Sequence, residues 1–292
     1  MDQNELVEKI TQAVVARLQQ TGGATSSDAA KGTAGNTAGN AARTGNTAQT
    51  GNAGDASTGR SVPTAETLLL PGELARYIDH TILKPEATEE DVAKVCDEAI
   101  EHNFYSVCVN TTWTEFCARR LRGTGVKLAV VVGFPLGAMD GRAKGFEARH
   151  AVELGAHEID MVMNVGAFKS GRLAEVEEDI RWVRRSIRQK TVLKVILETA
   201  LLTDEEKVIA CQISKKANAD FVKTSTGFSK GGATARDIAL MRRTVGPKMG
   251  VKASGGVRDY DGAVAMIRAG ATRIGASSSV AIIHGKSGSG NY

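Results

Sequence analysis

Short apolar runs, many of them β-branched, recur along most of this chain at nearly regular intervals, and this regularity limits the folds that it can adopt. About 22 to 34 residues separate one run from the next, which is the length of a strand and a helix together. Near-continuous apolar strands that alternate with helices are typical of a parallel sheet covered by helices. The eight runs are Tyr77–Leu83, Ser106–Asn110, Lys127–Pro135, Glu158–Gly166, Thr191–Thr199, Phe221–Gly227, Gly250–Gly256 and Arg273–Ser278.

Helix signals fill the intervals between these runs. Thr88 precedes Asp91, and Thr203 precedes Glu206, by the three residues that a capping box requires. An apolar stripe at helical spacing covers residues 173–187. Eight such units in about 220 residues predict an α/β fold, a (β/α)8 TIM barrel over residues 63–292. A doubly wound open sheet is the alternative, but no G-x-G-x-x-G follows the first run and no G-x-x-x-x-G-K-[ST] occurs.

The first 62 residues differ in composition from the rest of the chain. Residues 21–61 contain no Leu, Ile, Val, Phe, Tyr, Trp or Met, so they cannot bury enough apolar surface to fold. We therefore expect a disordered linker over residues 21–62. Residues 1–20 place Leu6, Ile10, Val14 and Leu18 at helical spacing. This pattern predicts an amphipathic helix that either folds onto a partner or docks on the chain's own barrel.

Composition argues against several classes of protein. No run of about 18 uncharged apolar residues occurs, which argues against a membrane span, and the acidic start does not resemble a secretory signal. The four cysteines lack metal-ligand spacing and a matching His cluster, so the sequence predicts no metal, no disulfide framework and a cytoplasmic location. Lys and Arg are interspersed with acids despite the formal net charge of +4, which favours an anionic small substrate over nucleic acid.

Three lysines lie inside predicted strands, where charge is unexpected. Lys194, Lys223 and Lys252 are 29 residues apart, one in each of three consecutive βα units. These strands are neighbours in a barrel, so we expect the three side chains to lie in register and to approach one another. Ammonium groups repel one another in a poorly solvated interior, which predicts that at least one has a lowered pKa and a neutral amine. A neutral amine attacks aldehydes and ketones to form a Schiff base.

Acids in the same strands supply the opposing charge that keeps such a cluster from being prohibitively unstable. Asp160 lies among apolar residues of the fourth run, a position that suits a proton relay beside Lys252. Asp79 lies in the first run, and Glu198 ends the fifth. For Glu198 we expect a salt bridge to one of the lysines.

Glycine-rich turns follow the last two predicted strands. One contains Gly255 and Gly256, and the other contains Gly275, Ser277 and Ser278. In TIM barrels the loops after strands seven and eight commonly bind phosphate through backbone N–H groups. Ordinary tight turns are the alternative, but two such turns at the two expected strands favour a phosphate site. The predicted substrate is then an aldehyde or ketone that carries phosphate.

From about Leu74 onward the chain resembles the deoxyribose-phosphate aldolase family, which comprises class I (Schiff-base) aldolases. The resemblance rests on IDHTILKP (78–85), VCVN (107–110), VVGFPLGA (131–138), EIDMVMNVGA (158–167), KVILET (194–199), DFVKTSTGF (220–228), VKASGGVRD (251–259) and IGASS (274–278). It implies a (β/α)8 barrel that reversibly cleaves 2-deoxy-D-ribose 5-phosphate to acetaldehyde and D-glyceraldehyde 3-phosphate. It also implies that neither a metal nor another cofactor takes part.

The resemblance implies roles for individual residues. Lys223 would form the Schiff base, Lys252 would lower the pKa of Lys223 and assist proton transfer, and Asp160 would complete the relay through a water. The resemblance places phosphate on Gly227, Gly255, Gly256, Ser277 and Ser278. It places further substrate contacts at Asp79, Thr81, Cys108, Lys194 and Thr226, although simple packing is the alternative for Cys108.

Two positions near these motifs depart from or extend the family pattern. Some family members have Lys where this chain has Phe228, so we expect the backbone to do more of the phosphate binding here. Tyr292 ends the chain in a Gly/Ser tail, and a C-terminal tyrosine reaches the active site in some members.

The front of the chain also departs from the compact family pattern. Residues 1–20, with the linker after them, are similar to the encapsulation peptides that carry enzymes into bacterial microcompartments. This similarity implies a shell-protein partner for residues 1–20 and a location in the lumen of a microcompartment, where acetaldehyde would be retained. A homodimer is left open. Two other functions also stay open: a Schiff-base lyase for another phosphorylated sugar, and a non-catalytic phosphate-binding barrel that serves as a shell scaffold.

Overall fold

The computed structural model describes Lys9, Gln12 and residues 70–288 of the chain. In this part of the chain the eight predicted runs form parallel strands that close into one barrel, because β1 pairs with both β2 and β8. The (β/α)8 prediction is therefore confirmed, and the open-sheet alternative was wrong. The strands are β1 (Ile78–Thr81), β2 (Ser106–Val109), β3 (Lys127–Val132), β4 (Glu158–Val162), β5 (Val192–Ile196), β6 (Phe221–Lys223), β7 (Gly250–Ser254) and β8 (Arg273–Ala276).

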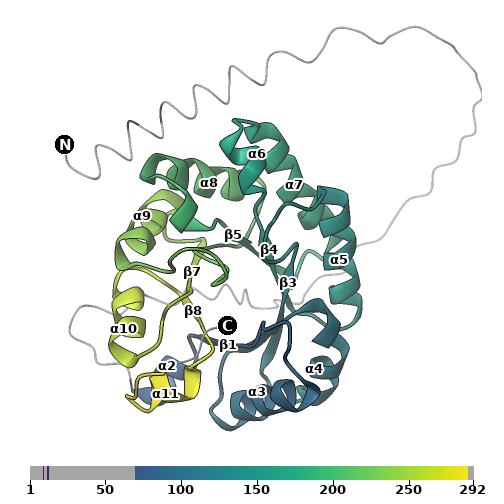
Figure 1. Cartoon of the computed structure of the whole chain (residues 1–292), viewed down its shortest axis with the longest axis vertical. Helices are drawn as coiled ribbons and strands as arrows, with labels where there is room; N and C mark the ends of the chain where they lie inside the picture. The colour runs from purple at the N-terminus through teal and green to yellow at the C-terminus, as the bar shows by residue number, and fades with distance from the viewer. Residues whose placement is uncertain (1–8, 10–11, 13–69, 289–292) are drawn as a thin grey trace, which may run out of the picture.

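Helices surround this barrel on the outside, as Figure 1 shows. The two predicted capping boxes are present, with Thr88 at the start of α3 and Thr203 at the start of α8. The predicted apolar stripe forms α7, which buries Val176, Ile180 and Val183. The helices are α2 (Pro71–Ala75), α3 (Glu89–Glu101), η1 (Thr111–Trp113), α4 (Thr114–Arg120), α5 (Gly141–Glu153), α6 (Val165–Lys169), α7 (Leu173–Ser186), η2 (Thr199–Leu201), α8 (Asp204–Lys216), α9 (Ala235–Val245), α10 (Tyr260–Arg268) and α11 (Ser279–Ile283).

The main hydrophobic core lies between the strands and these helices. Successive side chains of a strand point to opposite faces of the sheet. Ile159 and Val222 therefore pack in the outer core, while the next residues along the chain, Asp160 and Lys223, meet each other inside the barrel. TIM-barrel interiors are usually filled by branched apolar side chains, so charge in this lumen is a departure that points to function.

The sequence pattern predicts where the strands begin but not where they end. Every strand begins within one residue of its predicted start, but every strand also ends one to four residues earlier than predicted. After β3 the chain turns at Gly133, whose φ is 60°, and after β5 it turns at Glu198, whose φ is 58°. Beyond several strands the next residues are still apolar or β-branched, such as Ile82, Met163 and Leu197, so composition alone does not separate strand from loop there. These loops form the carboxyl-terminal rim, where TIM barrels carry their active sites.

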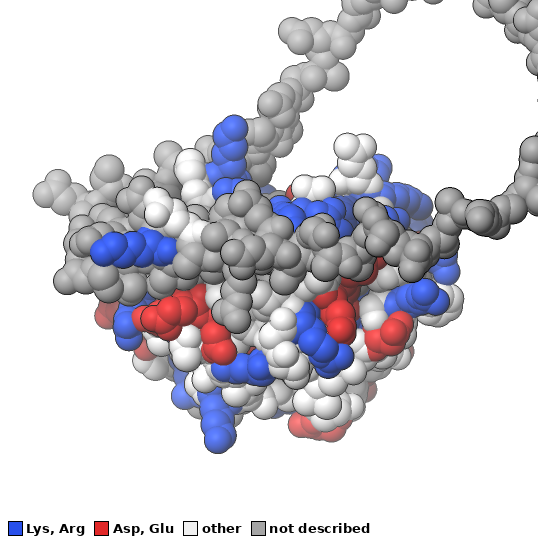
Figure 2. Space-filling model, turned by 90° about the horizontal axis from the view of Figure 1, so that it is seen from above, with Lys and Arg blue, Asp and Glu red and all other residues white. Residues whose placement is uncertain are grey.

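The predicted helix over residues 1–20, the linker over residues 21–62 and Tyr292 lie outside the described residues, apart from Lys9 and Gln12. Within the described part, none of the helices combines the length and the hydrophobicity that a membrane crossing demands. On the face seen in Figure 2, basic and acidic side chains of the described residues are interspersed rather than gathered into a stripe of one sign.

Candidate active site

Seven charged side chains from six strands meet inside the barrel, and we call them the lumenal charge network. All are buried, with exposed fractions between 0% and 4%. Each finds at least one partner of opposite charge. Because burial of unpaired charge is so unfavourable, a cluster of this size persists only when its members compensate one another. The members are Asp79, Glu158, Asp160, Lys194, Lys223, Lys252 and Arg273.

Asp160 of β4 is the central acid of the network. Its Oδ1 lies 2.5 Å from Lys194 Nζ, and its Oδ2 lies 2.9 Å from Lys223 Nζ and 2.8 Å from Lys252 Nζ. One carboxylate therefore contacts all three lysines that the sequence singled out. The structure brings together the predicted Schiff-base lysine, its second lysine and the predicted relay acid.

The three lysines are not all in register, so that prediction was wrong in part. Lys223 pairs with Lys252 across β6 and β7, but Lys194 pairs with Phe221, two residues before Lys223. Lys194 still reaches Asp160 because its neighbour across β4 and β5 is Asp160 itself. The equal spacing in sequence hid this offset, because βα units of equal length need not have equal strand register.

The network closes into a ring of alternating charges. From Asp160 the ring passes to Lys194, then Glu158 at 2.6 Å, and Glu158 lies 3.0 Å from Arg273 Nη1. Arg273 lies 2.9 Å from Asp79, and Asp79 lies 2.5 Å from Lys252, which returns to Asp160. Three carboxylates thus face three cations. Lys223 is attached to the ring only through Asp160, so a protonated Lys223 would add a positive charge that no carboxylate balances.

This arrangement lowers the pKa of one lysine and raises the pKa values of the other two. Burial lowers the pKa of Lys223, and the Lys252 ammonium lowers it further, while the Asp160 carboxylate opposes both without reversing the direction. Burial also disfavours the charge of Lys252, but Asp160 and Asp79 outweigh it and raise the pKa of Lys252 well above its usual value. Lys194, held by Asp160 and Glu158 against the effect of burial, likewise has a raised pKa. Lys223 is therefore the lysine of this network that is inclined to be neutral.

Two acids of the network, Asp160 and Asp79, have lowered pKa values and stay ionised. Burial raises the pKa of Asp160, but Lys194, Lys223 and Lys252 outweigh it and hold the pKa well below its usual value. Burial also opposes ionisation of Asp79, but Arg273 and Lys252 lower its pKa. Asp160 therefore accepts hydrogen bonds from the amines and does not act as a standing proton donor.

Other predicted substrate contacts lie around this network. Cys108 is fully buried, and burial raises the pKa of its thiol, so the side chain stays uncharged. Thr81 pairs with Cys108 across β1 and β2, and its hydroxyl donates to the Asp79 carbonyl at 2.8 Å. Ser106 donates to Asp79 Oδ1 at 2.7 Å, which helps to fix that carboxylate.

Glu198 does not form the predicted salt bridge. Its Oε2 instead accepts from the Thr226 hydroxyl at 2.5 Å and from the Thr226 N–H at 3.3 Å. Glu198 has a left-handed backbone, with a φ of 58°, and none of the lysines that the structure describes forms an ion pair with it. Glu198 thus fixes the loop after β6, the loop that carries Gly227.

A cavity of about 430 Å³ lies at the predicted phosphate loops. Its lining includes Gly227, Gly255, Gly256 and Ser277, while Ser278 is the next residue and occupies the N-cap position of α11. Gly232 also lines the cavity and lies very close to the backbone of Gly255. A Cβ at position 232 would lie 2.2 Å from the Gly255 carbonyl oxygen. Glycine is therefore required where these two loops meet. Except for Ser278, the structure brings the predicted phosphate residues to one cavity.

Arg258 also lines this cavity, and sequence reasoning missed it. It follows the SGGV turn directly, so a basic residue at the start of a phosphate loop was the available signal. Phe228 packs edge-on against Phe134, with ring centroids 5.3 Å apart. Arg258, rather than residue 228, is therefore the side-chain cation in the lining of this cavity.

Glu158 and Arg273 are the other charges that sequence reasoning missed. Glu158 precedes Asp160 by two residues, so strand periodicity places both on the same face of β4. Arg273 is the first residue of β8, another charged residue in an otherwise apolar strand. Among the described residues, no group of three or more His, Cys, Asp or Glu side chains is arranged to hold a metal ion.

A (β/α)8 barrel with a buried lysine cluster in its lumen is typical of the class I (Schiff-base) aldolases. Comparison with known proteins identifies the family. Residues 74–285 match the model of the DeoC/LacD family of aldolases, and the chain belongs to this family. Within it, the similar curated relatives include the deoxyribose-phosphate aldolase of Streptococcus gordonii, 62% identical over 220 residues, which are 75% of this chain and 100% of the relative. The enzyme of that name from a Geobacillus species is 56% identical over 223 residues, which are 76% of this chain and 100% of the relative.

A solved structure agrees with these sequence relatives. The deoxyribose phosphate aldolase of Aeropyrum pernix, described as tetrameric, superposes with a TM-score of 0.70 at 36% sequence identity. The match covers 74% of this chain and 92% of that chain. The family match begins at residue 74, so the first 73 residues lie outside it.

Proposed function

We propose that this chain is a class I aldolase that reversibly cleaves 2-deoxy-D-ribose 5-phosphate to acetaldehyde and D-glyceraldehyde 3-phosphate. The observation that carries the proposal is the Lys223 amine, buried beside Lys252 and Asp160 in a network whose charges balance when that amine is neutral. Relatives named deoxyribose-phosphate aldolase, at 56% to 62% identity, support this substrate.

Lys223 begins the reaction as a nucleophile. Its neutral amine adds to the C1 carbonyl of the open-chain sugar, and loss of water leaves a protonated imine. The C2–C3 bond then breaks as the 3-hydroxyl loses its proton, so that C3 becomes the aldehyde carbon of D-glyceraldehyde 3-phosphate. The bonding electrons pass into the imine and give a neutral enamine. Protonation of the enamine at C2 and hydrolysis release acetaldehyde and restore Lys223.

Lys252 and Asp160 favour these steps by charge. The Lys252 ammonium disfavours a second positive charge nearby, so it destabilises both protonated Lys223 and the protonated imine. The imine relieves this repulsion by becoming the neutral enamine, which is the step that breaks the carbon–carbon bond. Asp160 Oδ2 contacts both amines, at 2.9 and 2.8 Å, and so offers a path for proton movement between them, directly or through a water.

The test of this proposal is chemical trapping together with turnover. We expect acetaldehyde and cyanoborohydride to place one ethyl group on Lys223, located by peptide mass spectrometry, because hydride reduces the imine to a secondary amine. A coupled assay should detect D-glyceraldehyde 3-phosphate formed from 2-deoxyribose 5-phosphate. Trapping by a ketone but not by acetaldehyde would favour a lyase for another phosphorylated sugar. Absence of both trapping and turnover would favour the scaffold.

The phosphate cavity carries a separate prediction. Arg258→Ala removes the side-chain cation from the cavity, so we expect the KM for 2-deoxyribose 5-phosphate to rise about 10- to 100-fold with little change in kcat. Steady-state kinetics measure this effect, and the rate of acetaldehyde trapping should be unchanged because acetaldehyde has no phosphate. Arg268→Ala, at the exposed end of α10, is the matched control. An unchanged KM in Arg258→Ala would remove Arg258 from the phosphate site.

We infer a location from residues 1–20, which lie outside the family match. The amphipathic pattern and the Gly/Ala/Thr/Asn-rich linker after it support recruitment to a microcompartment shell protein. Deletion of residues 1–20 should leave aldolase turnover intact and abolish recruitment, measured by fluorescence co-localisation with a labelled shell. Unchanged co-localisation would reject the proposal. A homodimer stays a prediction for this chain, and light scattering measures it.

A further inference from the structure

Two buried charges lie at the amino-terminal end of the barrel, and the chemistry above does not use them. Glu158 is the first residue of β4 and Arg273 is the first residue of β8, with exposed fractions of 2% and 4%. Glu158 Oε2 lies 3.0 Å from Arg273 Nη1. Glu158 also contacts Lys194 at 2.6 Å, and Arg273 contacts Asp79 at 2.9 Å. Each therefore connects the floor of the barrel to a residue that touches the reacting end.

We propose that Glu158 and Arg273 are positioning residues that keep the Lys223 amine uncharged by completing the charge balance of the lumenal network from the opposite end of the barrel. The inference rests on the proposed function of Lys223 as the Schiff-base lysine. Neither residue has an ion pair or hydrogen bond with Lys223. Glu158 acts through Lys194 and Asp160, and Arg273 acts through Asp79 and Lys252.

The surroundings of Arg273 are shaped to hold a guanidinium group. Its CZ atom lies 3.5 Å from the centre of the Tyr105 ring and 5.3 Å from the centre of the Phe221 ring. Phe221 occupies its place only because Gly250 has no side chain, since a Cβ there would lie 2.2 Å from the ring. Aromatic rings and a glycine therefore support the arginine, in addition to its two carboxylate partners.

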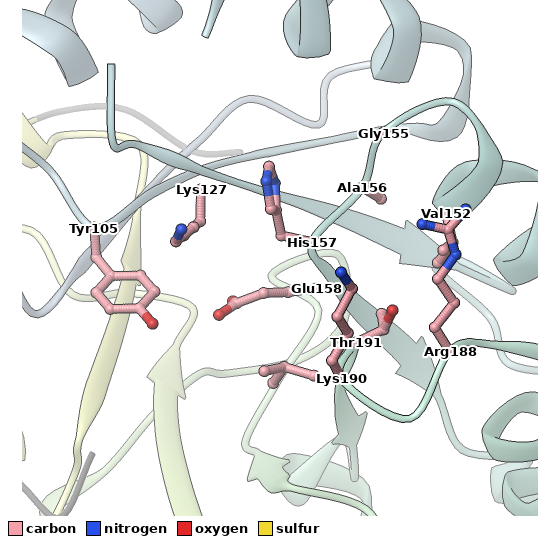
Figure 3. Close-up of a pocket in the computed structure, with 11 residues that line it drawn as sticks. Tyr105, Lys127, Val152, Gly155, Ala156, His157, Glu158, Arg188, Lys190 and Thr191 are labelled. Atoms are coloured by element: carbon pink, nitrogen blue, oxygen red, sulfur yellow. The ribbon is translucent and has the colours of Figure 1, made fainter. Parts of the chain in front are cut away.

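Glu158 also lines a cavity whose other charged side chains are exposed to solvent. This cavity of about 430 Å³ lies at the amino-terminal ends of β3, β4 and β5, where Figure 3 shows the Glu158 side chain pointing toward the Tyr105 ring. The other charged or titratable side chains of this cavity are Tyr105, whose ring stacks on Arg273, and Lys127, His157, Arg188 and Lys190. The last four are exposed, so solvent screens them more than it screens the buried ring of charges. At the other end, Cys108 faces the lysines as an uncharged thiol.

Charge balance predicts opposite effects for two single variants. Glu158→Gln removes a negative charge, so protonation of Lys223 becomes less favourable and its pKa falls. Arg273→Met removes a positive charge and leaves the carboxylates in excess, so protonation of Lys223 restores balance and its pKa rises. We expect shifts of about 1 pH unit in each direction. The double variant Glu158→Gln/Arg273→Met again has equal numbers of both charges, so its pKa should return to the wild-type value.

The pH dependence of acetaldehyde trapping at Lys223 measures these shifts, since acetaldehyde has no titrating group of its own. Below the wild-type midpoint, trapping should be about tenfold faster in Glu158→Gln and about tenfold slower in Arg273→Met. Arg273→Lys, which keeps the charge, should retain the wild-type midpoint. Asp237→Asn is the matched control, because Asp237 forms a buried ion pair with Lys207 outside the barrel, at 2.6 Å. Circular dichroism establishes that each variant is folded.

Opposite shifts in the single variants and recovery in the double variant support the inference. Midpoint shifts in the same direction, a shift in only one variant, or no recovery in the double variant would overturn it. Loss of packing alone gives no reason for the two midpoints to move in opposite directions. If Glu158→Gln does not fold, Asp79→Asn removes another carboxylate of the ring and should also lower the midpoint. If Arg273→Met does not fold, Arg273→Gln replaces it. Absence of trapping at Lys223 in the wild type would contradict the proposed function instead, so the two failures are distinguishable.

Discussion

Lys223→Ala is expected to abolish cleavage of 2-deoxyribose 5-phosphate, with a loss of at least about 10⁴-fold in kcat, and to abolish trapping by acetaldehyde. No other lysine of the network can replace it, because Lys194 and Lys252 are each held by two carboxylates that raise their pKa values. The fold should survive the substitution. Removal of Lys223 leaves three carboxylates facing three cations, so no buried charge loses its balance.

Lys207→Ala is the control for this variant, since Lys207 is a largely buried lysine of α8 that pairs with Asp237 of α9, outside the barrel. It should retain both turnover and trapping at Lys223. The coupled assay, the mass of the trapped peptide and thermal unfolding together distinguish lost chemistry from a lost fold. Turnover in folded Lys223→Ala at the wild-type rate would contradict the assignment and would favour the scaffold.

Asp160→Asn is expected to have the second large effect, on activity and stability together. The substitution removes the carboxylate shared by Lys194, Lys223 and Lys252 and leaves two permanent cations without their common partner. Breaking a buried ion pair costs about 3–5 kcal/mol, which lowers the Tm of a domain of this size by roughly 6–20 °C. Loss of the proton path should reduce kcat by about 10²- to 10⁴-fold.

Calorimetry and the coupled assay measure the two effects of Asp160→Asn. Asp237→Asn is the matched control, because it also removes one carboxylate from a buried ion pair but lies outside the lumen. The control should lose some stability and keep its kcat. If Asp160→Asn lost stability alone, to the same extent as Asp237→Asn, Asp160 would have only a structural role.

The barrel could be predicted from the sequence because its signal is repeated eight times. The apolar runs recur at nearly regular intervals, and all eight strand starts were located within one residue. The carboxyl-terminal ends could not be located as well. Beyond Val132 and Ile196 the chain stays apolar, but it leaves the sheet at backbone turns such as Gly133 and Glu198. An apolar pattern reports burial, and several residues of the loops at this rim, such as Leu83, Met163 and Leu197, are buried too.

The reactive centre was predictable only in part. Charged residues inside the apolar runs, such as Asp160 and Lys223, are conspicuous and were found. Glu158 and Arg273 begin their strands, where a charged residue usually lies in solvent, so their burial was not apparent. The partner of Glu198 is Thr226, in the loop after the next strand, and a pattern of residue types does not encode such a contact between loops.

The ring of charges joins positions that are far apart along the polypeptide. Arg273 and Asp79 are separated by 194 residues, and Lys252 and Asp160 by 92. A half-barrel, from either end of the chain, would bring only some of these groups together and would leave a surplus of one sign. The amine thus acquires its reactivity only when the first and last strands meet, so the onset of acetaldehyde trapping during refolding would report barrel closure.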